Sequence, residues 1–371
     1  MKIARSTKAT TLALAGALAL TLSACQSGSE GSDTTTSDST ASATGSGLSG
    51  TINGSGASTQ TNAQQAWRDN FRNSEPGVTV NYEATGSGTG VEQFIGGQVQ
   101  FAGSDKALSA DEMAAATTTC QDTGVVELPV YISPIAIAYN LPGVDELNLT
   151  ADNIADIFSG KITKWNDDAL KENNPDVDLP DLDIIPVNRA DKSGTTQNFT
   201  QYLKDAAGDE WSYDPAEVWP IEGTQSAEKT SGVVQLTQST EGAITYADAS
   251  QIGSLKAAKV EVGGEFLELS SDAAAAIIDG SPAASDATDT VLTIDLKRDG
   301  SIAGAYPIVL VSYLMGCQSY SDASTAANVK AYFNYVLSKE GQQAATDAGA
   351  GNAPISDTLR EKAQAAIDTI K

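Results

Sequence analysis

The sequence has no histidine among its 371 residues, and this absence removes several classes of active site. Histidine is the most common general base and metal ligand, so a Ser-His-Asp triad, a Cys-His pair and a histidine-based metal centre are all excluded. The sequence also lacks a compact carboxylate-rich metal motif. We therefore expect no catalytic residues, no metal and no cofactor, since a hydrolase would lack its usual means of activating a nucleophile.

Positive charge is the second scarce feature. Lysine and arginine number 22 against 48 aspartates and glutamates, which gives a formal net charge of −26. Proteins that bind nucleic acid or anionic lipid through charge need the opposite sign. We expect no nucleic-acid partner and no electrostatic docking on a membrane.

Cysteine is scarce as well, with three residues in the chain. Cys25 lies near the N terminus, which leaves Cys120 and Cys317 as an even pair. In an oxidising compartment such a pair typically forms a disulfide. Two buried free thiols would also fit the sequence, because the distance between the two positions is not visible in it.

Residues 1–24 have the pattern of a signal peptide: three early cations, the apolar run TTLALAGALALTL, and then LSAC ending at Cys25. The run is shorter than the roughly 20 apolar residues that cross a bilayer. A small-residue cleavage site ending in cysteine resembles the bacterial lipobox, which makes Cys25 the expected lipidation site. We expect a lipid-anchored protein on the extracytoplasmic face of the cell membrane; an ordinary secretory signal, with Cys25 incidental, is the alternative.

The segment 25–50 is almost entirely Ser, Thr, Gly and Asp, so it buries too little apolar surface to fold and is expected to be a flexible linker. A linker of this length has a typical reach of about 25–30 Å. The remainder, residues 51–371, is long enough for a large core and more naturally forms two domains than one.

Four strand-to-helix turns in this remainder are built alike. Each has alternating or apolar strand residues, then a loop of glycine and small hydroxyl residues, then apolar residues at helical spacing. The four stretches are GTINGSGASTQTNAQQAW, VTVNYEATGSGTGVEQFI, VQFAGSDKALSADEM and DIIPVNRADKSGTTQNFTQYL. Strands that alternate with helices predict an α/β fold with mainly parallel sheets.

Other segments complete this pattern. The apolar runs 125–141 and 306–315 predict long strands, and the spacing of apolar residues over 329–337 predicts an amphipathic helix. Ser109 and Glu112 match a capping box. The polar stretch 280–290 is expected to be a surface loop.

The glycine loops are suited to binding an anion. The first backbone N–H groups of a helix have no partner within it, and the helix dipole places partial positive charge there. One such loop is adequately explained as an ordinary helix cap, whereas four in one chain favour an anion site. A nucleotide fits poorly, because the chain has no G-x-x-x-x-G-K-[ST] motif and TGSGTG lacks the G-x-G-x-x-G spacing.

Two charged positions in these loops indicate which anion would bind. The Arg189 fork matches a tetrahedral oxyanion, and Asp191 could hold that fork in place, although a surface ion pair is the ordinary alternative. Asp105 is an acid in a loop of the same design. A carboxylate there would accept a hydrogen bond from protonated phosphate but repel sulfate, whereas the plain alternative is that Asp105 caps a turn.

Five stretches, taken together and in order, resemble the phosphate-binding protein of bacterial ABC phosphate-uptake systems, the PstS family, over residues 51–371. They are GSGASTQTNAQQAW, VNYEATGSGTGVEQFIGGQVQFAGSD, DIFSGKITKWND, PVNRADKSGTTQNFTQYL and EGAITYADA. The resemblance implies a two-domain, periplasmic-binding-protein-like α/β fold of type II, with the ligand cleft between domains joined by two crossover strands. Domain 1 would comprise residues 51–131 and 306–371, and domain 2 residues 132–305.

The resemblance also implies a function. The protein would be a monomer that binds inorganic phosphate and delivers it to the permease subunits of an ABC transporter; a binder of another oxyanion, or a secreted phosphoesterase, is the alternative. The family's binding positions fall here on Ser58, the backbone of Thr59, Ser87, Asp105, Arg189, Asp191, Ser193, Gly194 and Thr195. A disulfide between Cys120 and Cys317 would link the two sequence segments that make up domain 1.

The sequence departs from the family pattern at three places. The family usually has Thr-Phe at 58–59, Ser-Gly at 88–89 and Gly at 192, where this chain has Ser-Thr, Gly-Thr and Lys. Ser58 still has a hydroxyl group and Thr59 still has a backbone N–H, so we expect anion binding to be retained while the lining of the cleft changes. Lys192 would be either a solvated lysine or a local attraction for the ligand.

Overall fold

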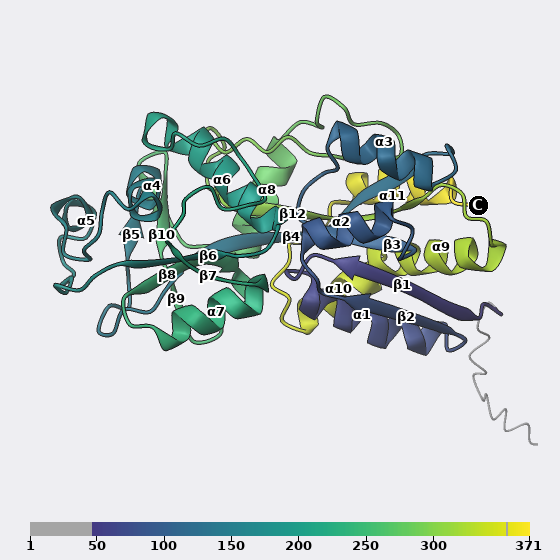
Figure 1. Ribbon diagram of the computed structural model, residues 1–371, viewed down its shortest axis with the longest axis horizontal. Helices are drawn as coiled ribbons and strands as arrows, with labels where there is room; N and C mark the ends of the chain where they lie inside the picture. Colours follow the sequence, from purple (N-terminus) through teal and green to yellow (C-terminus); the bar gives the residue numbers. More distant parts are fainter. Residues whose placement is uncertain (1–46, 354) are drawn as a thin grey trace, which may run out of the picture. The chain divides into compact units, whose positions relative to one another are not determined.

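The structure, a computed structural model, describes residues 47–353 and 355–371 (Figure 1). The predicted signal peptide, the predicted lipidation site Cys25 and most of the predicted linker lie outside the described residues. Within the described part of the chain, no helix is both long enough and apolar enough to cross a membrane.

A nine-stranded sheet organises the chain, with the order β2-β1-β3-β12-β4-β8-β6-β7 and β9 paired to β4. A second, three-stranded sheet has the order β11-β10-β5. The strands of the large sheet are β1 (Gly50–Gly56), β2 (Val78–Glu83), β3 (Phe101–Ser104), β4 (Val125–Tyr139), β6 (Ile185–Arg189), β7 (Gln225–Ala227), β8 (Ala243–Asp248), β9 (Lys256–Ala257) and β12 (Val309–Cys317). Those of the small sheet are β5 (Asn148–Leu149), β10 (Lys259–Val262) and β11 (Glu265–Leu267).

Two groups of parallel strands flank an antiparallel centre. In the first strand group β1 pairs in parallel with β2 and β3, and in the second β6 pairs in parallel with β7 and β8. The strand β4 joins them, since it pairs antiparallel with β12 along its first part and with β8 along its last. The large sheet is therefore mixed rather than mainly parallel, because β12 returns toward the first group from the far end of the chain.

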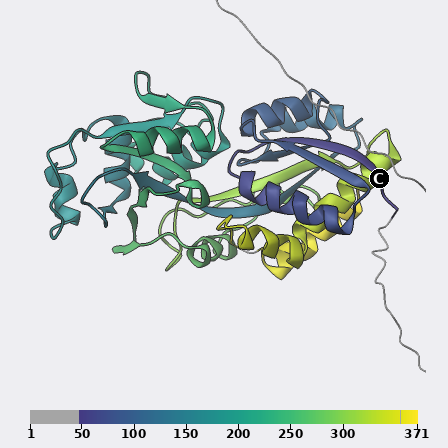
Figure 2. The same cartoon turned by 90° about the horizontal axis from the view of Figure 1, so that it is seen from below.

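The helices surround the two strand groups (Figures 1 and 2). Those around the first group are α1 (Thr61–Ser74), α2 (Ser87–Ile95), α3 (Ala110–Thr119), α9 (Ala323–Leu337), α10 (Lys339–Asp347) and α11 (Asp357–Asp368). Those around the second are α4 (Ala151–Ser159), α5 (Asp168–Asn173), α6 (Gly194–Ala206), α7 (Lys229–Ser239) and α8 (Ser271–Gly280). The beginning and the end of the described chain thus pack together, whereas the division into two domains at residues 131 and 305 stays a prediction.

The central strands form the core. Every residue of β4 and of β12 is buried, which explains why both appear in the sequence as nearly continuous apolar runs. The predicted helix near the end of the chain is confirmed as α9, whose Val329, Tyr332 and Phe333 are fully buried. The predicted capping box at Ser109 and Glu112 is also present at the start of α3.

A disulfide joins Cys120, at the end of α3, to Cys317, at the end of β12. The two residues are 197 positions apart in sequence. A cross-link of this kind limits the unfolded chain and is typically worth 2–5 kcal/mol in a secreted protein. Here it ties the first strand group to the strand that enters it from the far end of the chain.

Candidate functional site

The residues of the candidate site lie at or just after the carboxyl ends of five parallel strands. In the first strand group they come after β1, β2 and β3, and in the second after β6 and β7. Ligands of open α/β sheets bind at such carboxyl ends, where loops and helix N-termini converge. The two groups point these ends at each other, so their loops meet.

One close meeting point of the two strand groups is Gly194, the first residue of α6. A side-chain Cβ at this position would lie 2.9 Å from the Cβ of Asp105 and 2.9 Å from the Oγ of Ser87, which is the first residue of α2. Only glycine allows this approach without a shift of the neighbouring atoms. The start of α2 and the start of α6 therefore converge on Asp105, and neither helix carries an acidic residue in its first turn.

Asp105 accepts hydrogen bonds from three hydroxyl groups. Oδ1 receives Thr59 Oγ1 at 2.6 Å and Ser312 Oγ at 2.7 Å, and Oδ2 receives Thr195 Oγ1 at 2.9 Å. The Asp105 backbone N–H donates to Ser87 Oγ at 3.1 Å. Burial raises the pKa of Asp105 above its usual value, while these hydroxyl groups and the Arg189 charge act in the opposite direction.

Arg189, which is buried, and Asp191, which is partly buried, form a bidentate pair. Arg189 Nε donates to Asp191 Oδ1 at 2.7 Å and Nη2 donates to Oδ2 at 2.5 Å. Burial alone would raise the pKa of Asp191, but the hydrogen bonds and charge of Arg189 outweigh it and lower the pKa below its usual value. Among the described residues, Asp191 is the only side chain to which the Arg189 guanidinium donates, so part of this group is left for a ligand.

Ser193 caps α6 by accepting from the Thr196 backbone N–H at 3.2 Å. Ser58 is placed differently, because its Oγ lies 3.0 Å from Thr230 Oγ1 and accepts from the Thr230 backbone N–H at 3.1 Å. Thr230 belongs to the first turn of α7, so the loop after β1 reaches the start of a helix in the second strand group. The structure thus brings the predicted residues of both groups together around Asp105 and Arg189, with Ser58 directed at α7.

Several residues of this region were not predicted from the sequence. They include Thr230, which donates to Ser58, and Ser312, which donates to Asp105. Gln251 Nε2 also donates to the backbone oxygens of Ser58 and Thr59, at 3.1 and 2.9 Å. Tyr246, in β8, accepts from the Arg189 backbone N–H at 3.2 Å. None of these side chains follows a glycine loop. The loop pattern that predicted the other binding residues therefore could not predict these.

Lys192, one of the departures from the family pattern, extends over the start of α2. A Cβ on Gly88 would lie 2.5 Å from the Cβ of Lys192, so the lysine stem fills the space that this glycine leaves. Its ammonium group forms an ion pair with Glu92 of α2. Lys192 is therefore neither fully solvated nor directed at Asp105.

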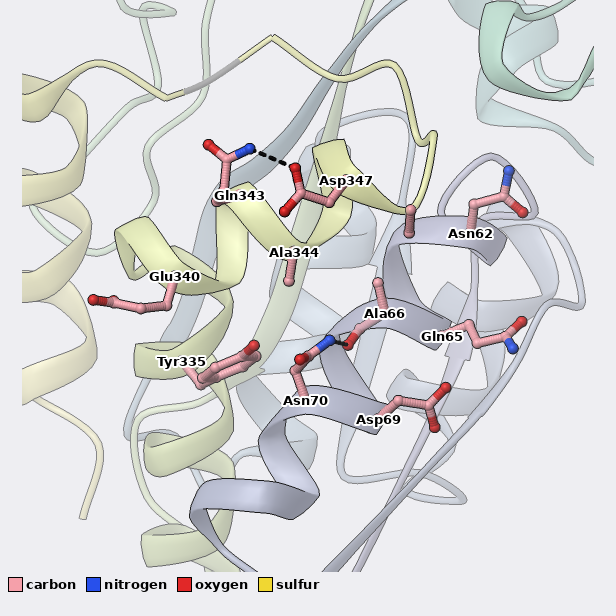
Figure 3. A pocket seen from close by; sticks show the side chains of 11 residues that line it. Asn62, Gln65, Ala66, Asp69, Asn70, Tyr335, Glu340, Gln343, Ala344 and Asp347 are labelled. Carbon is pink, nitrogen blue, oxygen red and sulfur yellow. Dashed lines mark hydrogen bonds between the residues drawn. The ribbon is translucent and has the colours of Figure 1, made fainter.

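A cavity of about 250 Å³ opens next to Asp105 and is bordered by Lys106, Gln197 and Arg298. A different groove, of about 720 Å³, is lined by Asn62 and Asp69 of α1 and by Gln343 and Asp347 of α10 (Figure 3). This groove contains none of the predicted binding residues. Over residues 47–353 and 355–371, no acidic or cysteine side chains are grouped so as to hold a metal ion.

Comparison with known proteins shows the family to which the chain belongs. The chain matches the model of the PBP superfamily domain over residues 39–340. It is 34% identical over 374 residues to the phosphate-binding protein PstS 3 of Mycobacterium tuberculosis (strain ATCC 25618 / H37Rv), with 100% of both chains covered. It is 37% identical over 325 residues to PstS 3 of Mycobacterium leprae (strain TN), covering 86% of this chain and 87% of the relative.

Solved structures share the fold at lower identity. The periplasmic phosphate-binding protein PfluDING, solved with phosphate bound, has a TM-score of 0.69 and 21% identity, with 84% of this chain and 92% of that chain covered. A phosphate-binding protein of Stenotrophomonas maltophilia has a TM-score of 0.66 and 21% identity, with coverages of 85% and 94%. The expected periplasmic-binding-protein-like α/β fold is confirmed.

Proposed function

Since the chain belongs to the PBP superfamily and, within it, to the phosphate-binding PstS family, we propose that it binds inorganic phosphate and delivers it to an ABC-transporter permease for phosphate import. The proposed site lies around Asp105, where the loops of the two strand groups meet. Its ligands would be the residues named above from the resemblance.

One observation carries the proposal: a buried carboxylate stands among groups that favour an anion. The starts of α2 and α6 supply backbone N–H groups and partial positive charge, and Arg189 supplies a fork held by Asp191. Asp105 accepts hydrogen bonds and has none to donate when ionised. A tetrahedral oxyanion that keeps a proton at neutral pH, as phosphate does, can satisfy both kinds of group, whereas sulfate cannot.

The net charge of −26 does not oppose this function. Charges on the distant surface are screened beyond a Debye length of about 8 Å, whereas the donors of the site act at hydrogen-bond distance. Fixed dipoles and one arginine can therefore hold an anion inside an acidic protein.

The proposal makes the chain a binding protein without catalytic residues or a cofactor. The curated relatives are named for phosphate binding. The phosphoesterase alternative would require turnover of a chromogenic phosphate ester, which we expect the purified protein not to show. The second alternative, a binder of another oxyanion, is tested by the titration described below.

We also propose that Cys25 carries a lipid and holds the protein, as a monomer, at the extracytoplasmic face of the membrane next to its permease. The lipobox-like LSAC and the polar linker that follows it support this proposal. The variant Cys25→Ala should release the protein from the membrane fraction, since no helix of the described residues is long and apolar enough to hold the signal-cleaved chain there. Unchanged fractionation would contradict the anchor without affecting phosphate binding.

Calorimetric titration of phosphate-free protein tests the main proposal. We expect tight binding of phosphate, binding of arsenate, which has the same charge and protonation, and no binding of sulfate at neutral pH. Equal binding of sulfate and phosphate would assign the site to oxyanions in general. Absence of any phosphate binding would refute the proposed function.

A further inference from the structure

A row of buried hydrogen bonds ends at Asp105. Tyr332 OH donates to Gln64 Oε1 at 2.7 Å, and Gln64 Nε2 donates to Gln60 Oε1 at 2.8 Å. Gln60 Nε2 donates to Ser312 Oγ at 2.7 Å, and Ser312 Oγ donates to Asp105 Oδ1 at 2.7 Å. The row crosses from α9 through the start of α1 to β12, and its first four members are 0% exposed.

The direction of this row follows from the chemistry of its members. Each carboxamide accepts through its oxygen and donates through its nitrogen, so both glutamines turn their oxygens toward Tyr332 and their nitrogens toward Asp105. Burial raises the pKa of Tyr332 well above its usual value, so the phenol keeps its proton and acts as the donor. Ser312 Oγ therefore receives a hydrogen bond and has one proton left to give.

That proton points to Asp105. The other acceptor near Ser312 Oγ is the backbone oxygen of Ser104 at 3.3 Å, which is considerably farther than Asp105 Oδ1 at 2.7 Å. The pairing of β12 with β4 shifts register between Ser312 and Tyr313. Bulges of this kind re-aim side chains, and here the irregularity lies at the serine that turns toward the site.

The hydrogen bonds leave one acceptor position of Asp105 free. Oδ1 already accepts from Thr59 and Ser312, whereas Oδ2 accepts from Thr195 alone. A carboxylate oxygen accepts about two hydrogen bonds, so the remaining capacity is on Oδ2.

From this geometry we infer that the row Tyr332–Gln64–Gln60–Ser312 is a positioning device, which holds Asp105 as an acceptor and leaves Oδ2 for the protonated oxygen of the ligand. This role rests on the proposed phosphate binding. It predicts that Gln60 and Ser312, which need not touch the ligand, control both the proton affinity of Asp105 and its choice of anion.

The surroundings of Asp105 indicate the direction of the effect. The other charged or titratable groups facing it are Arg189 from β6, whose charge lowers the pKa of Asp105, and Tyr82 from β2, whose own pKa is raised by burial and by Asp105. Lys106, next in the chain, is paired with Glu112 at 2.5 Å. Burial raises the pKa of Asp105, and the hydrogen bond from Ser312 lowers it. Loss of this hydrogen bond should therefore raise the pKa of Asp105.

The first experiment reads Asp105 directly, in ligand-free protein. The side-chain carboxyl carbon is titrated by ¹³C NMR in the wild type, Ser312→Ala and Gln60→Met, with Asp105→Asn to identify its signal. We expect a higher pKa in both variants, and a value near that of the wild type in Ser312→Thr, which keeps the hydroxyl. Gln342→Met is the matched control, since Gln342 is also buried but donates only to the backbone oxygens of Val130 and Val336.

The second experiment measures phosphate and sulfate affinity of the same proteins between pH 5 and 8. Phosphate itself titrates in this range, so each variant is compared with the wild type at the same pH. We expect Ser312→Ala and Gln60→Met to lose affinity for phosphate by about 10-fold, most strongly at the acid end, where a protonated Asp105 no longer accepts. The same protonation should improve the relative binding of sulfate, and Gln342→Met should show neither change.

The outcomes are separable. Melting temperatures show whether a variant is merely less stable, which alone would move neither the pKa of Asp105 nor the preference between anions. An unchanged Asp105 titration in both variants would overturn the positioning role, as would a shifted titration without any change in anion preference. If the wild type fails to bind phosphate, the proposed function is refuted, while the carboxyl titration still decides whether the row acts on Asp105.

Discussion

Lys192 and Glu92, 100 positions apart in sequence, form an ion pair that links the loop before α6 to the helix α2. The two residues belong to opposite strand groups, and the backbone N–H of Gly88 donates to the Lys192 backbone oxygen at 3.4 Å beside them. The contact lies next to Asp191 and Ser193, which are proposed phosphate ligands. It therefore adds an attraction between the two strand groups that exists only when their loops meet.

We predict that Lys192→Gln increases the rate of phosphate dissociation by about 2–5-fold and leaves the association rate nearly unchanged. The effect is modest because both side chains are more than half exposed, and ion pairs of this kind contribute about 0–1 kcal/mol. Stopped-flow measurement of phosphate release gives the rates. In Lys339→Gln, which loses an exposed pair with Asp357 far from the site, the rate should stay at the wild-type value. Equal rates in all three proteins would show that the pair does not retain the ligand.

A second prediction concerns the close approach at Gly194. The methyl group of Gly194→Ala would lie 2.9 Å from the Cβ of Asp105 and from the Oγ of Ser87, so the start of α6 has to move away from both. Hydrogen bonds to charged groups are worth about 1.5–3 kcal/mol, so loss of one donor of α6 should lower phosphate affinity by about 10- to 100-fold. The melting temperature should change little. Gly96→Ala, at the other end of α2, is the control and should bind phosphate normally.

Stability should depend on pH through Glu127, a fully buried residue of β4. Its Oε1 accepts from the Leu108 backbone N–H at 2.9 Å, while Oε2 has no hydrogen-bond partner among the described residues. Burial raises the pKa of Glu127 to about 7. Between its unfolded value and this folded value the native protein binds a proton that the unfolded chain does not, so the free energy of unfolding increases as the pH falls through that window.

The variant Glu127→Gln tests this prediction. An amide keeps the acceptor for Leu108 and is neutral at every pH, so the contribution of residue 127 to the pH dependence should disappear. We expect the variant to be more stable than the wild type at pH 8, by on the order of 2–3 kcal/mol, and similar to it near pH 4.5. Urea unfolding at both pH values measures the difference. Parallel profiles for the two proteins would show that Glu127 titrates normally.

The sequence predicted the parts of this molecule that depend on local pattern. Periodicity and turn residues predict the strand before Asp105, the strand that ends at Arg189, the helices that begin at Ser87 and Gly194, and the buried run of β4. Because parallel strands present their carboxyl ends on one side, the glycine loops could also be expected to gather there.

The remainder depends on contacts between distant segments. Ser312 lies 207 positions from Asp105 and is embedded in the apolar run VLVSYLM, where a single serine gives no indication of a partner. Thr230 lies 172 positions from Ser58 and is preceded by no glycine loop. The mixed parallel and antiparallel order of the large sheet also depends on distant contacts. The strand β12 lies antiparallel because it pairs with β3 and β4, and its own sequence does not indicate this direction.

The last prediction concerns the charge of Asp105, which distinguishes phosphate from sulfate. In a dry site, an acceptor that finds no proton on the ligand faces an anion as an unpaired charge, and sites built around one specific hydrogen bond reject analogues that lack it by about 10⁴–10⁵-fold. In Asp105→Asn the neutral amide can turn its NH₂ group toward either anion. We therefore expect phosphate affinity to fall and sulfate binding to appear. The preference for phosphate over sulfate should decrease mainly because the variant no longer repels sulfate.

Arg189→Ala is the matched comparison, because it removes donors that both anions would use. It should weaken phosphate binding strongly without creating any preference for sulfate, and it also leaves Asp191 without its partner in a partly buried position. Competition titrations of the wild type and the two variants with both anions measure the preference directly. If Asp105→Asn excludes sulfate as strictly as the wild type does, discrimination lies in the shape of the site and the number of its donors, and the acceptor role given to Asp105 is wrong.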